Sequence, residues 1–125
     1  MILVDTSSLI DSLCGRKRSA ARLRRLIEAG ERMQLPSLVM YEWLRGPRVS
    51  QELRIQEALF PSEEAVPFGL HEAALAAELY RTVRSPRGRE IDLAIAATAI
   101  SMDAALWTLN DADFSDIPGL LLLQN

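Results

Sequence analysis

The sequence predicts an α/β fold in which helices cover both faces of a central parallel sheet. Short apolar segments with the composition of buried strands alternate with longer segments of helical periodicity along the chain. This alternation is typical of parallel sheets, because helical crossovers join parallel strands and pack on both faces. With 125 residues the chain is long enough for one domain with a substantial core but not for two. We therefore expect residues 1–125 to form a single domain.

The N-terminal third is expected to contribute two strands and a helix. Residues 2–5 form the first, buried strand. After a turn, the residues over about 19–29 have the apolar stripe of an amphipathic helix, with Ser19 as its candidate N-cap and Gly30 at its end. Residues 33–35 form a short second strand.

Two further helices are expected in the middle of the chain. Ser37 is a candidate N-cap for a helix over about 38–45, which Gly46 and the proline after it bring to an end. Residues 49–59 also have the apolar spacing of a helix.

The C-terminal half is expected to alternate strands and helices again. Residues 65–68 form a short strand, placed at the sheet edge because it contains a proline. A helix over 71–84 follows, and REIDLAIAATAISM (89–102) is nearly apolar, as expected for a buried helix. Strands over 104–108 and 119–123 complete the sheet.

Composition excludes several classes of protein. Hydrophobic residues make up 49% and charged residues 25%, which is ordinary for a water-soluble globular protein. No segment approaches the roughly 20 apolar residues that span a bilayer, and Asp5 and Asp11 interrupt the one candidate signal peptide, so we expect a cytoplasmic protein without membrane contact. The single cysteine, Cys14, excludes a disulfide framework and a thiolate metal cluster.

The net charge of -3 means that any contact with nucleic acid must use local cationic patches. Two such patches occur, and nearly all their cations are arginines. The first lies in GRKRSAARLRR and contains Arg16, Lys17, Arg18, Arg22, Arg24 and Arg25. The second contains Arg81, Arg84, Arg87 and Arg89. They are either solvated helix faces or contacts for phosphate groups, and the sequence leaves both open.

Acidic residues mark the carboxyl edge of the expected sheet, where open parallel sheets bind ligands. Asp5 ends the first strand, and Asp111 and Asp113 follow the strand ALWTL. Glu42 and Asp92 lie in apolar helices, near their N-terminal parts. All of these elements are expected to present the acids to one edge.

Each acid taken alone has an ordinary structural explanation. Asp5 could cap the next helix, Glu42 could pair with an arginine, Asp92 could favour a helix N-terminus, and Asp111 and Asp113 could be turn residues. A cluster of carboxylates in apolar surroundings is unfavourable, however, unless a cation neutralises it. Mg²⁺ or Mn²⁺, which prefer oxygen ligands, would do so and could activate water against a phosphodiester.

Three stretches make the sequence resemble the PIN-domain ribonucleases, and among them the VapC-type toxins of toxin–antitoxin pairs. They are LVDTSSL, PSLVMYEWLRG and REIDLAIAATAISMDAALWTLNDADFSDIPGLLL, and together the resemblance runs over the whole chain. It implies a three-layer α/β/α fold (PIN-like) and hydrolysis of RNA phosphodiester bonds at an acidic Mg²⁺ or Mn²⁺ site. It also implies a homodimer and a cognate antitoxin that blocks the active-site groove.

The resemblance assigns metal and catalytic roles to the acids. Asp5, Glu42 and Asp92 match the family's metal-site positions. The fourth position stays open between Asp111, nearer the strand end, and Asp113, which matches the family's Asp-Phe pair. Supporting roles are expected for a set of hydroxyl and amide side chains, namely Thr6, Ser7, Ser8, Thr108 and Asn110. The hydroxyls after Asp5 either bind water or phosphate near the ion or cap the next turn.

Partner contacts can be expected on the helix pair over 38–60. The candidates are Trp43, Leu44, Leu53 and Leu59, each of which could equally belong to the core. The only histidine, His71, is expected at the surface and has no role in the mechanism.

Other functions fit the sequence less well. A phosphoaspartyl protein, such as a receiver domain or a haloacid-dehalogenase-like phosphatase, needs a lysine after a late strand, but the only lysine is Lys17. Neither glycine-rich nucleotide-binding motif occurs. An RNA-processing PIN nuclease that is not a toxin, or a non-catalytic PIN domain that binds RNA or protein, remains as the alternative.

Overall fold

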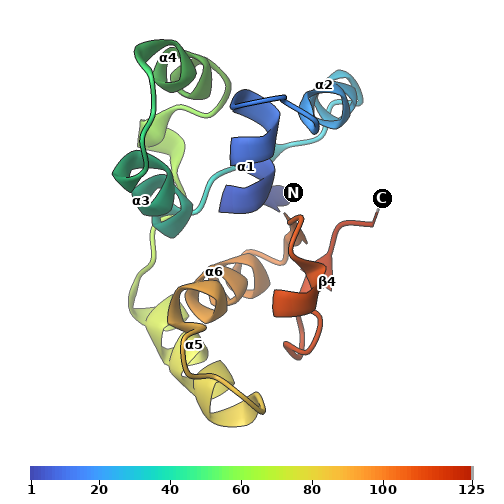
Figure 1. The fold of residues 1–125 in the computed structure, drawn as a ribbon. Coiled ribbons are helices and arrows are strands. Elements are labelled where there is room, and N and C mark those ends of the chain that lie inside the picture. The colour runs from blue at the N-terminus through green and yellow to red at the C-terminus, as the bar shows by residue number, and fades with distance from the viewer. Residues whose placement is uncertain (125) are drawn as a thin grey trace.

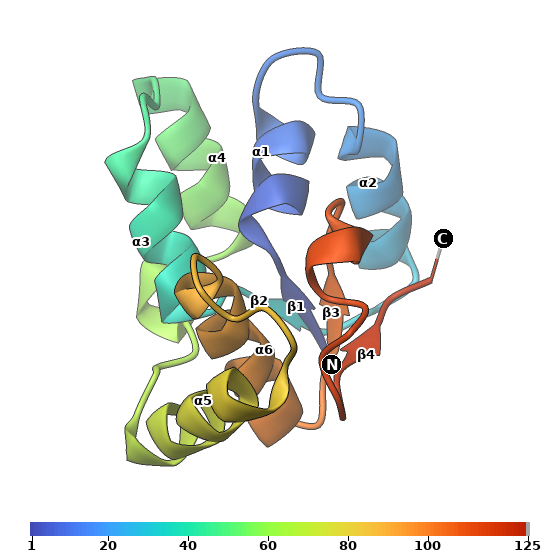
Figure 2. The same cartoon turned by 60° about the horizontal axis from the view of Figure 1, so that its bottom comes forward.

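The fold is that of a computed structural model, which describes residues 1–124. Within these residues four parallel strands form one sheet in the order β2-β1-β3-β4 (Figure 2). The strands are β1 (Ile2–Val4), β2 (Met33–Gln34), β3 (Ala105–Trp107) and β4 (Leu121–Leu122). The predicted parallel sheet is confirmed, although the regular strands are shorter than expected.

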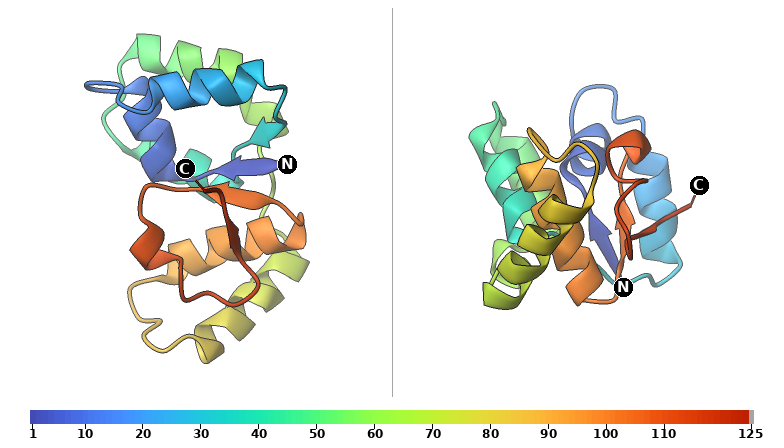
Figure 3. Two further views of the ribbon diagram at one scale, coloured as in Figure 1. Left: turned by 90° about the vertical axis from the view of Figure 1, so that its right-hand side faces the viewer. Right: turned by 90° about the horizontal axis from the view of Figure 1, so that it is seen from below.

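Helices cover both faces of this sheet, which confirms the predicted three-layer α/β/α arrangement. In the described part of the chain they are α1 (Thr6–Leu13), α2 (Ala20–Glu28), α3 (Ser37–Arg45), α4 (Ser50–Leu59), α5 (Leu70–Thr82) and α6 (Glu90–Ser101), with short 3₁₀ helices η1 (Ser62–Glu64) and η2 (Asp111–Asp113). Figure 3 shows α1 and α2 on one side of the strands and α5 and α6 on the other. Helix α3 contacts both α1 and α6, beside the sheet (Figure 1).

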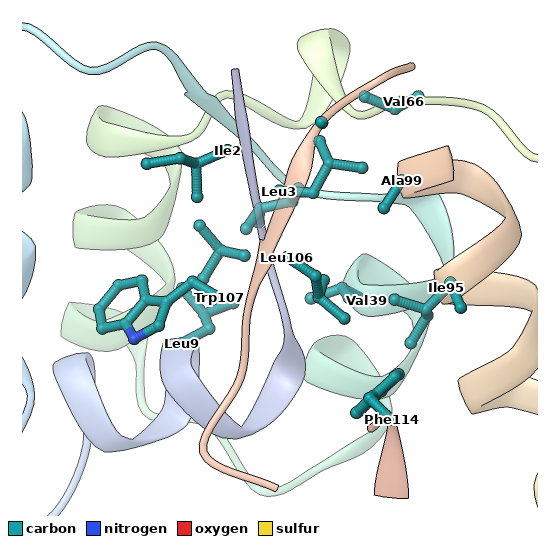
Figure 4. Packing of buried hydrophobic residues seen from close by; sticks show 14 of the residues in the cluster. Ile2, Leu3, Leu9, Val39, Val66, Ile95, Ala99, Leu106, Trp107 and Phe114 are labelled. Atoms are coloured by element: carbon teal, nitrogen blue, oxygen red, sulfur yellow. The ribbon is translucent and has the colours of Figure 1, made fainter. Parts of the chain in front are cut away.

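Strand β1 lies at the centre and sets the register. Leu3 pairs with Gln34 of β2 and with Leu106 of β3, and Val4 pairs with Trp107. Because side chains alternate along a strand, Leu106 and Trp107 point to opposite faces. Figure 4 shows Trp107 on the side of Leu9 from α1 and Leu106 on the side of Ile95 from α6. All three β1 side chains are buried, as expected for a strand covered on both faces.

Helix α1 was not predicted. Its inward face consists of Ser8, Leu9, Ser12 and Leu13, so half of that face is polar. The two serines are satisfied internally, since Ser8 donates to the carbonyl of Trp107 (3.0 Å) and Ser12 to that of Ser8 (2.7 Å). The bond from Ser8 is a tertiary contact with β3, whereas the bond from Ser12 lies within the helix, and the first of these helps to hold a serine-containing helix on the sheet.

Two expected helix caps differ from the structure, while one helix end agrees. Ser19 precedes α2, but its hydroxyl donates to Asp11 Oδ2 (2.7 Å) instead of capping. Ser37 is the first residue of α3, and Pro36 occupies the N-cap position. Gly30 follows α2 with φ +78, the left-handed conformation that ends helices at glycine.

The strand expected over 65–68 is reduced to a single parallel bridge between Val66 and Pro36. It lies at the edge beyond β2, where the prediction placed it. Proline has no N–H to donate, which limits how far this edge can be extended.

Of the residues expected to contact a partner, some are buried in the core and others are exposed at the surface. Trp43 is fully buried and donates to Gln56 Oε1 (3.2 Å), so its alternative reading as core is the correct one. Leu44 is 56% and Leu59 is 41% exposed, whereas Leu53 is partly buried against the core. His71 is exposed, as predicted. No helix in residues 1–124 is both long and apolar enough to span a membrane.

Candidate active site

The site lies where the direction of the chain connections reverses. From β1 the chain runs to β2 on one side, and from β3 it runs to β4 on the other, so the carboxyl ends of β1 and β3 form the switch point of the sheet. Ligands bind at such points in open α/β sheets. Asp5 follows β1 and Thr108 follows β3, which puts both side chains at this edge.

Asp5 is buried and held by hydroxyl groups. Its backbone N–H donates to the carbonyl of Trp107 (2.9 Å), which extends the β1–β3 pairing by one residue. Its Oδ2 accepts hydrogen bonds from Thr108 Oγ1 (2.7 Å) and Ser7 Oγ (2.9 Å). The side chain of Asp5 does not cap α1, so the capping interpretation is wrong, and Thr108 orients this carboxylate.

Glu42 comes from α3 and is tied to the start of α1. Thr6 Oγ1 donates to its Oε1 at 2.6 Å, and Arg45 Nη2 lies 3.5 Å from its Oε2. The Arg45 side chain is half exposed, so this ion pair contributes little. The bond from Thr6 connects the residue after Asp5 to the second acid, which fixes α3 relative to the end of β1.

Asp92 lies in the first turn of α6 and is surrounded by the other acids. Burial, together with the negative charges of Asp5, Asp113 and Glu42, raises its pKa from 3.8 to about 6, against an opposing contribution from Arg89. An acid whose pKa is raised by three other carboxylates lies within their electrostatic range. The structure therefore brings Asp5, Glu42, Asp92 and Asp113 together.

Asp111 and Asp113 lie on η2, and only Asp113 is among the charges that raise the pKa of Asp92. Both side chains are exposed. With three residues per turn, residues two positions apart on a 3₁₀ helix are rotated by about 240° about its axis. The side chains of Asp111 and Asp113 therefore point in different directions although the two residues are close in sequence. Asn110 is exposed, and its backbone N–H donates to Thr108 Oγ1 (3.0 Å).

Arg89 links the start of α6 to the segment after β3. Its Nη1 and Nη2 donate to the two carboxylate oxygens of Asp116 (3.0 and 2.6 Å), and Nη2 also donates to the carbonyl of Asp113 (2.8 Å). The hydrogen bonds to Asp116 raise the pKa of the guanidinium. Arg89 is therefore neither a free phosphate contact nor a solvated cation, the two readings that the sequence left open.

Two of the contributing residues were not assigned this way by sequence reasoning. Ser7 bonds Asp5 and accepts from the N–H of Leu109 (3.0 Å), so it joins the two strand ends. Ser8, for which contact with water or phosphate and capping of the next turn were both left open, is fully buried, and its hydroxyl donates to the carbonyl of Trp107. The alternation of side chains after a strand end does not resolve which of three consecutive hydroxyls faces the acids.

The donor set has the chemistry of a site for a hard cation. Every charged group that raises the pKa of Asp92 is a carboxylate, and oxygen is the ligand that Mg²⁺ and Mn²⁺ prefer. Among residues 1–124 no three acidic, cysteine or histidine side chains lie close enough as they stand to chelate one ion. The arrangement thus fits the charge and ligand type of such a cation, with a smaller number of protein ligands completed by water.

The fold and this edge of acids define the class of protein. The sequence matches the PIN domain family over residues 2–120, and the chain belongs to that family.

Several known proteins are similar to this chain in sequence or in fold. The chain is 38% identical to Ribonuclease VapC19 of Mycobacterium tuberculosis over 122 residues, which covers 96% of this chain and 97% of that protein. Its fold is similar to the toxin–antitoxin complex from Klebsiella pneumoniae (27% identity, 97% and 96% of the two chains, TM-score 0.72). It is also similar to VapBC2 from Rickettsia felis bound to a fragment of promoter DNA (22% identity, 98% of each chain, TM-score 0.74).

Proposed function

We propose that this chain is a divalent-metal-dependent endoribonuclease and the toxin component of a VapC-type toxin–antitoxin pair. The observation that carries the proposal is the placement of Asp5, Glu42 and Asp113 near Asp92 at the switch point, where their charges add to the effect of burial and the pKa of Asp92 is raised to about 6. The 38% identity to a ribonuclease across nearly the whole chain supports the choice of RNA as substrate.

In this proposal Asp5, Glu42, Asp92 and Asp113 hold Mg²⁺ or Mn²⁺. The bound ion supplies Lewis-acid chemistry, which polarises a phosphodiester and acidifies water. Thr108 and Ser7 hold Asp5 by one oxygen, Oδ2, and among residues 1–124 its Oδ1 has no hydrogen-bond partner. That oxygen is thus free to act as a ligand.

The hydroxyl groups of the site orient acids without neutralising them. A hydroxyl donates a hydrogen bond to a carboxylate but carries no charge, so Asp5 and Glu42 keep their attraction for a cation. The one arginine that pairs with these two acids, Arg45, lies 3.5 Å from Glu42 Oε2 and is half exposed, so it neutralises the site only weakly. The negative charge that the site keeps argues against the non-catalytic alternative, because acids facing RNA phosphates would weaken binding unless a cation lies between them.

The partner we propose is a segment of the cognate antitoxin. Helices α1, α2 and α4 surround an open groove of about 520 Å³. Its apolar lining includes Leu13, Leu23, Ile27, Ile55 and Leu59, and its charged lining residues are Lys17, Arg24 and Glu28, two cations and one acid. An amphipathic segment with apolar anchors and acidic flanks would match this lining, and similar solved structures are toxin–antitoxin complexes.

A homodimer acting in the cytoplasm completes the proposal. Exposed apolar side chains on α3, including Leu44 and Tyr41, are available for contact between copies. A PIN nuclease that processes RNA without being a toxin would share the site but would lack the antitoxin. Binding of an antitoxin peptide therefore separates these two functions.

Cleavage of RNA by the purified protein tests the activity. We expect cleavage with Mn²⁺ or Mg²⁺ and none after chelation, and a loss of at least about 100-fold in Asp5→Asn and Asp92→Asn, since each removes a charged ligand. Asp103→Asn is the matched control, because Asp103 is exposed in the turn after α6 with φ 53, a conformation that asparagine tolerates. Undiminished cleavage by both site variants, or cleavage that survives chelation, would refute the proposal.

A further inference from the structure

Arg89 occupies the N-cap position of α6, one turn before Asp92. Its guanidinium reaches across to the segment after β3, where it binds Asp116 through both carboxylate oxygens and the backbone carbonyl of Asp113. The side chain is only 19% exposed. One residue thereby connects the helix that carries one proposed ligand to the loop that carries another.

Few contacts other than those of Arg89 hold the loop that carries Asp113 on the side of α6. Asp5 ends a central strand, and Glu42 and Asp92 lie on helices of nine and 12 residues, whereas Asp113 lies on a three-residue 3₁₀ helix. Its side chain is exposed and makes no hydrogen bond within residues 1–124. The direction of the Asp113 carboxylate therefore depends on where its backbone is held.

Phe114 and Ile117 are buried, so they anchor the loop only on the side that faces the core. Figure 4 shows Phe114 pointing toward Ile95 of α6. Arginine is suited to the remaining link, because its planar fork can bind two carboxylate oxygens and a carbonyl in one geometry, which a lysine ammonium does not reproduce.

We propose that Arg89 and Asp116 are a positioning pair, which holds the backbone of Asp113 so that its carboxylate faces Asp92 in the metal site. Neither residue touches the substrate. The inference rests on the proposed function, since it assigns Asp113 as the fourth ligand.

Binding of Mn²⁺ by calorimetry tests the pair, with Arg89→Lys and Asp116→Asn as variants. Arg89→Lys keeps the charge and removes the fork, and Asp116→Asn keeps the shape and removes the charge. Loss of a group that orients a ligand typically weakens metal affinity 10- to 100-fold, so we expect a decrease of about tenfold for each variant. Arg87→Lys, at an exposed arginine in the same turn, should bind Mn²⁺ like the parent.

A double-mutant cycle separates positioning from general damage. If Arg89 acts through Asp113, then adding Arg89→Lys to Asp113→Asn should change Mn²⁺ affinity by less than about twofold. An equal loss in both backgrounds would mean that Arg89 stabilises the fold as a whole, and parent-like affinity in Arg89→Lys would mean that it positions nothing. Either result overturns the inference.

Amide hydrogen exchange provides a readout that needs neither metal nor RNA. The amides of Asp113, Phe114, Ser115 and Ile117 donate within the loop, and in Arg89→Lys their exchange should accelerate while that of β1 stays unchanged. Unchanged exchange in that loop overturns the inference even for a protein that binds no Mn²⁺. Failure of the parent to cleave RNA would refute the proposed function instead, and would leave these exchange rates to decide the role of Arg89.

Discussion

Replacing Asp92 with asparagine should stabilise the metal-free protein at neutral and alkaline pH. Burial, followed by the charges of Asp5, Asp113 and Glu42, raises the pKa of Asp92 from 3.8 to about 6, against the opposing effect of Arg89. Because the folded protein binds this proton more tightly than the unfolded chain does, stability must fall as pH rises between these values. Above about pH 6 the ionised carboxylate is a permanent destabilising charge.

The size of the effect follows from the same pKa. One pKa unit corresponds to about 1.4 kcal/mol, so the interval from 3.8 to about 6 sets an upper value of ~3 kcal/mol. Asp92 is only partly buried, and water screens its interactions with the other acids. We therefore expect Asp92→Asn to gain about 1–2 kcal/mol at pH 8 and nearly nothing at about pH 4, where Asp92 is protonated in the folded protein.

Urea unfolding in the presence of a chelator, repeated across that pH range, measures this directly. The gain should grow through the window between about pH 4 and pH 6 and then stay constant. Asp103→Asn, which removes an exposed charge outside the site, should run parallel to the parent. A parallel curve for Asp92→Asn as well would refute the electrostatic description of the site.

Adding Mn²⁺ should reverse the order of stability at pH 8. A ligand that binds only the folded state stabilises it in proportion to its affinity, and the parent keeps the full set of carboxylates. The parent should gain more from Mn²⁺ than Asp92→Asn does. An equal gain in both proteins would place the ion elsewhere.

Three further changes have defined outcomes. Asp113→Asn should reduce RNA cleavage at least about tenfold while Asp111→Asn reduces it less than about threefold, because only the former carboxylate faces the other acids; equal losses would contradict this choice. Gln56→Leu should lower the free energy of unfolding by about 1–3 kcal/mol, since it leaves the buried N–H of Trp43 without its acceptor, and an unchanged urea midpoint would argue against that bond. Ile27→Asp, at a 43% exposed position in the groove, should weaken antitoxin binding more than about tenfold by calorimetry and leave cleavage unchanged; full binding would place the antitoxin elsewhere.

The sheet and its carboxyl edge were predictable because their signals are local. Strands β1 and β3 are each an apolar run followed directly by a polar residue, and Asp5 and Thr108 occupy those two ends. The parallel arrangement then brings the ends together without any further information. Glu42 and Asp92 were predictable because carboxylates in apolar helices require a compensating interaction.

Other features could not be predicted because they depend on tertiary contacts. Helix α1 has only eight residues and two serines on its buried face, and Ser8 donates to the carbonyl of Trp107, which only the folded chain supplies. The choice between Asp111 and Asp113 depends on a single 3₁₀ turn, which a sequence reading treats only as a loop. Arg89 was grouped with exposed cations because its partner, Asp116, lies 27 residues away.

The site thus keeps its negative charge, because most of the groups that bind its acids are uncharged. Hydroxyl groups, which carry no charge, bind Asp5 and one oxygen of Glu42. Arg89 lies close enough to lower the pKa of Asp92, yet its hydrogen bonds go to Asp116 and to a backbone carbonyl. Had these donors been cations bound to the site carboxylates, the fold would be more stable and the edge would attract a metal ion less. The burial and repulsion that make ionised Asp92 unfavourable in the metal-free protein also give the site its affinity for a cation.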